Sequence, residues 1–132
     1  MKLYYSPGAC SLAPHIALRE AGLDFDIEKV DLRAKTTQSG KSFTDINPKG
    51  YVPALTLKDG SLFTENAAML QYIADQANGA GLAPNLPSIE RFRLTVWLTL
   101  LPSALHNGVA TLFNLALPPG FRPPLTPSTH LR

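Results

Sequence analysis

Two stretches decide the fold of this chain: Tyr5-Ser-Pro-Gly-Ala-Cys10-Ser11, and Val52-Pro53-Ala54-Leu55 followed by Leu62-Phe63-Thr64-Glu65-Asn66. The first predicts a strand that turns into a helix, with Cys10 in the turn and Ser11 as the helix cap. In the second, the peptide bond before the proline can be cis and can present backbone groups to a peptide ligand. The turn at Glu65 then supplies a carboxylate and helix-terminal N–H groups for a small zwitterion.

The spacing of apolar residues around these stretches predicts the remaining elements. Leu23, Phe25 and Ile27 alternate with acidic residues, which is typical of a strand with one buried face. Lys58-Asp59-Gly60 lies between two β-type runs and favours a hairpin. The full prediction is strands at 2–6, 23–30, 52–57 and 61–64, helices at 12–21, 43–46 and 65–76, and a polar loop at 33–41.

These motifs resemble the glutathione transferases, and Cys10 after Pro-Gly-Ala, in place of a catalytic Tyr or Ser, resembles the bacterial beta class. The resemblance implies an α/β fold: a thioredoxin-like N-terminal domain in the order βαβ-α-ββα, followed by the start of an all-α domain. It implies a glutathione-binding domain at 1–77, a linker at 78–87, a partial helical domain at 88–116 and a Pro-rich irregular tail at 117–132.

The resemblance also implies an activity. We expect a glutathione transferase that conjugates reduced glutathione to small electrophiles in detoxification, with glutathione as co-substrate and no other cofactor. Thiol–disulfide exchange through Cys10 would be an additional chemistry. Two alternatives stay open: a truncated, non-catalytic remnant of a glutathione site, and a glutaredoxin-like exchanger that acts through Cys10 alone. Members of the family form homodimers, so the resemblance implies a homodimer here if the partial helical domain suffices to form it.

Cys10 and His106 are the expected catalytic residues. The thiolate is the reactive form of a cysteine, and the N-terminus of the following helix would lower the pKa of Cys10. The alternative for Cys10 is a buried small hydrophobe. The resemblance implies that His106 lies on a helix of the helical domain and faces the glutathione sulfur, although Pro102 interrupts that helix.

Seven residues are expected to bind glutathione by resemblance. Glu65 would receive the ammonium of the γ-glutamyl end, while Asn66 and helix N–H groups would hold its carboxylate. Val52 would pair its backbone with the cysteinyl part, next to a cis peptide bond. Lys35 would lie near the glycine carboxylate and supply a positive charge. The residues expected to bind glutathione are Tyr5, Lys35, Val52, Pro53, Glu65, Asn66 and Ser103.

Composition narrows the function classes. The 132 residues carry a net charge of +2 with 17% charged residues, which gives no nucleic-acid or membrane signal. The longest apolar stretch, at 94–105, is too short and too interrupted to span a bilayer. One cysteine and three scattered histidines offer no zinc spacing. We expect no metal, and a cytoplasmic location because no secretory signal opens the chain.

The final stretch departs from the pattern of the family. From Arg91 to Arg132 there is no Asp or Glu, and prolines crowd the last sixteen residues. Such a segment does not continue as an amphipathic helix. Two explanations stay open: a truncation or reading-frame disruption near Thr99, or a tail that has diverged naturally.

Overall fold

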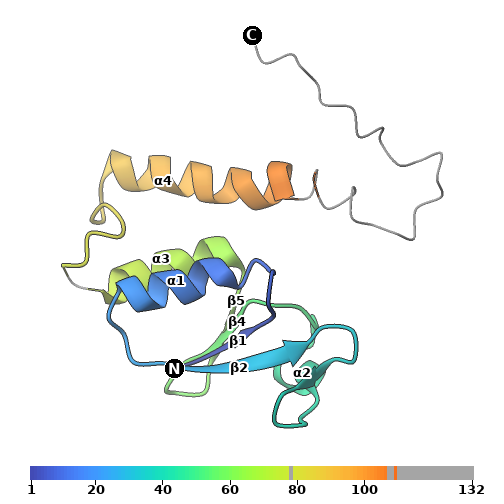
Figure 1. The fold of residues 1–132 in the computed structure, drawn as a ribbon. Coiled ribbons are helices and arrows are strands. Elements are labelled where there is room, and N and C mark those ends of the chain that lie inside the picture. Colours follow the sequence, from blue (N-terminus) through green and yellow to red (C-terminus); the bar gives the residue numbers. More distant parts are fainter. Residues whose placement is uncertain (78, 107–108, 110–132) are drawn as a thin grey trace, which may run out of the picture. The chain divides into compact units, whose positions relative to one another are not determined.

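The computed structural model describes residues 1–77, 79–106 and 109, and it is drawn in Figure 1. The chain divides into two compact units, Met1–Leu94 and Thr95–Arg132, each of which is described by itself. The first unit therefore takes in the expected linker and the first residues of the next helix. The four segments expected from the sequence stay predictions, and the tail at 117–132 lies outside the described residues.

The first unit is built on a mixed five-stranded sheet with strand order β3-β2-β1-β4-β5. Strand β1 (Lys2–Tyr5) pairs in parallel with β2 (Asp26–Asp31) and antiparallel with β4 (Ala54–Thr56). Strand β5 (Leu62–Thr64) completes the predicted hairpin with β4, and β3 (Thr36–Thr37) pairs with β2. This is the expected thioredoxin-like arrangement, which is confirmed.

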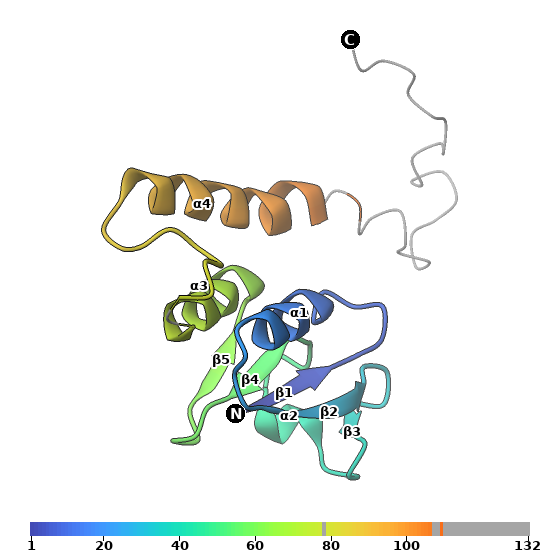
Figure 2. The same cartoon turned by 60° about the vertical axis from the view of Figure 1, so that its left-hand side comes forward.

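Helices cover both faces of this sheet. Helices α1 (Leu12–Glu20) and α3 (Asn66–Gln76) lie on one face, and the short helix α2 (Phe43–Ile46) lies on the other (Figure 2). Because successive side chains of a strand point to opposite faces, β1 contributes to two cores. Leu3 packs in a cluster with residues of α1, β4 and α3: Leu18, Leu55, Met69 and Ile73. Tyr4 packs in the second cluster, with Val30, Phe43, Val52 and Ala54.

Three sequence-based expectations for this unit were wrong in detail. Strand β2 begins at Asp26, and Ile27 is 42% exposed although the alternation predicted a buried face. The two-residue strand β3 falls in the expected loop, because its pairing with β2 involves only two positions and leaves no periodic pattern. Ser11 holds the cap position, but its hydroxyl donates to the backbone carbonyl of Ser6 and makes no side-chain cap bond.

The linker is tied to α3 by one buried arginine. Arg91 lies in the first turn of α4 (Ile89–Leu100) and is only 2% exposed. Its guanidinium pairs with the Asp75 carboxylate at 2.8 Å and donates to the Pro84 carbonyl at 2.9 Å. Its Nε donates to Gln71 Oε1 at 3.4 Å. A buried guanidinium requires such partners, because an unpaired buried charge costs several kcal/mol.

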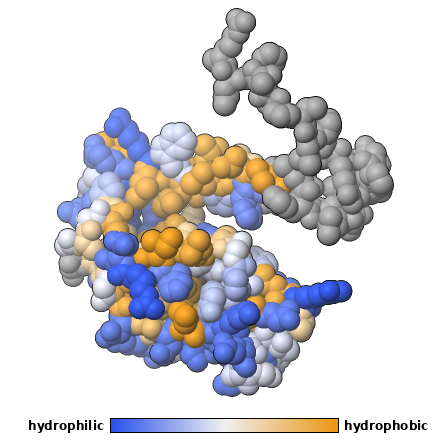
Figure 3. Space-filling view, viewed as in Figure 1, coloured by the Kyte–Doolittle hydropathy of each residue, from blue (hydrophilic) through white to orange (hydrophobic). Residues whose placement is uncertain are grey.

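The second unit begins within α4. The α-helix gives way at Leu101–His106 to a wider π-helical turn that contains Pro102, which has no N–H to donate. Hydrophobic surface is visible over α4 in Figure 3. The exposed apolar side chains of α4 include Val96, Trp97 and Leu100 in this unit and Phe92 in the first. Within the described part of the chain, no helix is long and apolar enough to cross a membrane.

The core of the first unit yields a stability prediction. Leu18 is fully buried and Leu12, on the same helix, is 59% exposed. Replacing Leu18 by Ala should lower the free energy of unfolding by about 2–5 kcal/mol, because it removes buried methyl groups and leaves a cavity. The matched control Leu12→Ala should change it by about 0.5 kcal/mol. Urea unfolding followed by circular dichroism measures both, and equal effects would contradict the described core.

Candidate functional site

The two sequence motifs meet at one end of the sheet. The thiol of Cys10, in the turn after β1, donates to the backbone carbonyl of Val52 at 3.2 Å. The peptide bond between Val52 and Pro53 is cis, as the sequence predicted. From the first turn of α3, Asn66 Nδ2 donates to the backbone carbonyl of Cys10 at 3.0 Å. The structure thus brings together four expected site residues from three separate segments.

Burial determines the protonation of Cys10. Removal from water raises the pKa of the Cys10 thiol above its ordinary value, and the nearby Glu65 carboxylate raises it further. The backbone N–H groups of Cys10 and Ser11 act in the opposite direction, but they do not outweigh burial. The N–H groups at the helix N-terminus thus lower this pKa, as expected, but burial outweighs them and the net shift is upward. Cys10 is a protonated thiol that donates a hydrogen bond at neutral pH.

Glu65 presents its carboxylate at the start of α3. Its backbone adopts a left-handed φ of 71°, which is uncommon for a residue with a side chain. Lys49 Nζ lies 2.7 Å from Glu65 Oε1, and the Tyr51 hydroxyl donates to the same oxygen at 3.2 Å. The Lys49 hydrogen bond holds the pKa of Glu65 below its ordinary value. Glu65 is thus an ionised carboxylate, suited to an ammonium ligand.

Lys35 lies beside the Val52 motif. Its Nζ donates to the backbone carbonyl of Gly50 at 2.6 Å, two residues before Val52. Its aliphatic chain passes close to Gly50, where an added Cβ would meet it at 3.5 Å. The lysine therefore lies at the edge of the same segment whose backbone is expected to pair with a peptide ligand.

The remaining three expected residues have other surroundings. The Tyr5 ring packs on the His15 ring, with 6.2 Å between ring centroids, as a residue with a packing role would. Ser103 and His106 belong to the second unit, within the π-helical turn. The Ser103 hydroxyl donates there to the backbone carbonyl of Thr99 at 2.7 Å. The parts that Ser103 and His106 would play in a glutathione site stay predictions.

Sequence reasoning missed Lys49 and Tyr51. Asn47-Pro48-Lys49-Gly50 has the composition of a turn, and it forms one, since the Gly50 N–H donates to the Asn47 carbonyl. The position of this turn in the sequence could have revealed them. The turn leads directly into the cis-proline segment, so its side chains lie at the end of β4 where the site is. A lysine there can reach a carboxylate at the end of β5, because the two strands are paired.

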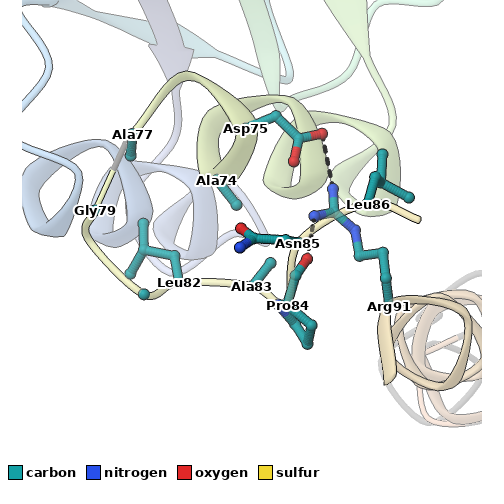
Figure 4. Close-up of a pocket in the computed structure, with 11 residues that line it drawn as sticks. Ala74, Asp75, Ala77, Gly79, Leu82, Ala83, Pro84, Asn85, Leu86 and Arg91 are labelled. Atoms are coloured by element: carbon teal, nitrogen blue, oxygen red, sulfur yellow. Dashed lines mark hydrogen bonds and ion pairs between the residues drawn. The ribbon is translucent and has the colours of Figure 1, made fainter. Parts of the chain in front are cut away.

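A separate cavity of about 620 Å³ lies between the C-terminal half of α3 and the linker (Figure 4). Arg91 and Asp75 form its charged part, and the remaining lining residues are small or apolar for the most part. None of the expected site residues lines it. Among the residues that the structure describes, no group of three or more His, Cys, Asp or Glu could hold a metal ion.

Comparison with known proteins gives a consistent picture. Residues 8–76 match the family described as glutathione S-transferase, N-terminal domain. The chain is 46% identical over 123 residues to glutathione S-transferase GstA of Escherichia coli O157:H7, covering 93% of this chain and 61% of that protein.

Solved structures agree with this match. A sphingomonad glutathione S-transferase complexed with glutathione superposes with a TM-score of 0.88 at 52% identity, covering 91% of this chain and 60% of that one. A bacterial beta-class enzyme from Sphingomonas chungbukensis gives 0.87 at 51% identity, with the same coverage. The chain thus spans about three fifths of the length of these relatives. It belongs to the glutathione S-transferase family, as a bacterial member of the beta class.

Proposed function

We propose that this chain binds reduced glutathione at the end of the sheet where the Cys10 turn, the cis-Pro53 segment and Glu65 meet. The observation that carries the proposal is the 3.2 Å hydrogen bond from the Cys10 thiol to the Val52 carbonyl, which joins the two motifs. A relative of 52% identity was solved complexed with glutathione, which supports the same ligand here.

Each end of glutathione has a proposed partner. The Glu65 carboxylate receives the γ-glutamyl ammonium, and N–H groups at the start of α3 face the adjacent carboxylate. The Val52 backbone, beside the cis Pro53, pairs with the cysteinyl part, as one strand pairs with another. Lys35 supplies a positive charge for the glycine carboxylate. In the second unit, Ser103 is proposed as a further ligand contact. Tyr5, which packs on His15, is proposed only to shape the site.

The proposed reaction is thiolate attack on an electrophile. The glutathione sulfur loses its proton, forms a bond to an electrophilic carbon, and the leaving group departs with the electron pair of the broken bond. Cys10 assists as a thiol that donates a hydrogen bond to the glutathione sulfur, which stabilises the thiolate. His106 is proposed as the acceptor of the thiol proton, which a neutral imidazole can take. Water would carry that proton away afterwards.

The alternative functions differ in the protonation state that they require of Cys10. A glutaredoxin-like exchanger requires a Cys10 thiolate, and burial disfavours that form. Transferase chemistry, in which Cys10 keeps its proton, is therefore favoured over exchange. A non-catalytic remnant would lack a formed site, whereas the Cys10, Val52 and Asn66 contacts support a formed one. A homodimer, a role in detoxification and a cytoplasmic location remain proposals from the resemblance.

The protonation of Cys10 can be tested directly, because the chain has a single cysteine. The rate of Cys10 alkylation by iodoacetamide is measured as a function of pH, with N-acetylcysteine amide in parallel as the reference. The pH midpoint for Cys10 should lie above that of the reference, since burial disfavours the thiolate. Rates are measured between about pH 6 and 10, around the ordinary thiol pKa. A midpoint below about 7.5, the range of activated cysteines, would contradict the proposed role and favour the exchanger.

Glutathione binding is tested by calorimetric titration of the purified full chain. We expect saturable one-to-one binding, weakened in Cys10→Ala because that variant loses the thiol donor facing the ligand sulfur. Transfer to a small electrophile is assayed on the same samples, and mass spectrometry checks that Cys10 stays unmodified. A folded chain that binds no glutathione would support the remnant, and glutathionylation of Cys10 without transfer would support the exchanger.

A further inference from the structure

An exposed ion pair at the proposed glutathione site includes a lysine that has been given no role so far. It joins Lys49 to Glu65 at 2.7 Å, with the two side chains 48% and 59% exposed. Lys49 Nζ also lies 3.3 Å from the Thr64 hydroxyl and 5.9 Å from the centre of the Tyr51 ring. The lysine is thus held at the end of β5, beside the carboxylate that is expected to receive an ammonium.

The charges of this site mirror those of glutathione. Lys35, Lys49 and Glu65 supply two positive charges and one negative charge, whereas the tripeptide carries two carboxylates and one ammonium. Lys35, at the Gly50 carbonyl, is proposed to face the glycine carboxylate. The remaining carboxylate belongs to the γ-glutamyl group and is attached to the same carbon as the ammonium. Lys49, adjacent to Glu65, is the lysine placed to meet it.

Asn66, the side chain expected to bind that carboxylate, already makes another hydrogen bond. Asn66 already donates an amide N–H to the Cys10 carbonyl. Its Oδ1 is buried with no hydrogen-bond partner among the described residues, and an amide oxygen cannot donate to a carboxylate. The side chain of Asn66 is therefore a weaker carboxylate partner than the sequence suggested, which leaves a role for a cation.

Replacing the Lys49–Glu65 ion pair by ion pairs with the ligand costs little free energy. Exposed ion pairs contribute little to stability, so a small shift of Lys49 away from Glu65 has a low free-energy cost. The contacts that described residues make with this carboxylate both fall on Oε1, from Lys49 and Tyr51, and Oε2 faces no described donor. An ammonium can therefore approach Oε2 while Lys49 turns to the neighbouring carboxylate of the ligand.

We propose, resting on the proposed function, that Lys49 is a specificity-determining residue for the α-carboxylate of the γ-glutamyl group. It pairs with that carboxylate while Glu65 pairs with the ammonium, so that one internal ion pair is replaced by two pairs with the ligand. The site then selects an α-amino acid zwitterion over an amine that lacks the adjacent carboxylate.

The test compares two peptides on the full chain. Glutathione and 4-aminobutanoyl-cysteinyl-glycine, which keeps the ammonium but lacks the α-carboxylate, are titrated by calorimetry into wild type, Lys49→Met and Lys49→Arg. Lys49→Met should weaken glutathione binding about fivefold, as expected for an exposed ion pair, and leave the analogue unchanged. Lys49→Arg should retain the preference for glutathione, because the positive charge is kept.

A matched control is Lys58→Met, which removes the same charge from an exposed position in the turn at the other end of β4 and β5. It should leave both affinities unchanged. Unchanged or tighter glutathione binding in Lys49→Met would overturn the proposal and would make Lys49 a competitor of the ligand ammonium. Equal weakening of both peptides would also overturn it. If wild type binds neither peptide, the proposed function itself fails, which is a distinct result.

Discussion

Strand β1 is the element on which the rest of the first unit depends, because it is paired along both edges and buried on both faces. Its side chains Leu3 and Tyr4 enter opposite cores, so one short strand fixes where α1, α3 and α2 can pack. The same pairing builds the site. Tyr4 lies opposite Ala54, and Ala54 lies opposite Thr64, so the end of β1, the start of β4 and the end of β5 coincide. Cys10, Val52 and Glu65 follow or precede those three ends.

Three polar side chains of this site have partners within the chain itself. The Cys10 thiol has the Val52 carbonyl, Glu65 has Lys49 and Tyr51, and the ammonium of Lys35 has a backbone carbonyl. Ligand binding at such a site is an exchange of hydrogen bonds, so the net gain from each bond is small. Affinity then depends on how well the ligand matches the charges as a set, more than on any one contact.

The fold was predictable from the sequence because its signals are local. The turn at Cys10, the cis proline and the hairpin at Gly60 each appear within a few residues, and their order specifies the sheet. What depends on tertiary burial was not predictable. The pKa of Cys10 rises because neighbouring segments exclude water from it, which no spacing of residues reveals. Lys49 was missed because its contact with Glu65 arises only once β4 and β5 pair.

For Arg91, the domain assigned from its position in the sequence differs from the domain that its side chain contacts. By sequence it belongs to the helical region, since it lies in the first turn of α4, but its guanidinium contacts α3 and the linker. In a chimaera that joins the sheet domain of one relative to the helices of another, Arg91 must therefore be inherited together with Gln71 and Asp75. A junction placed in the linker would split the three residues between parents and leave a buried guanidinium facing unmatched partners.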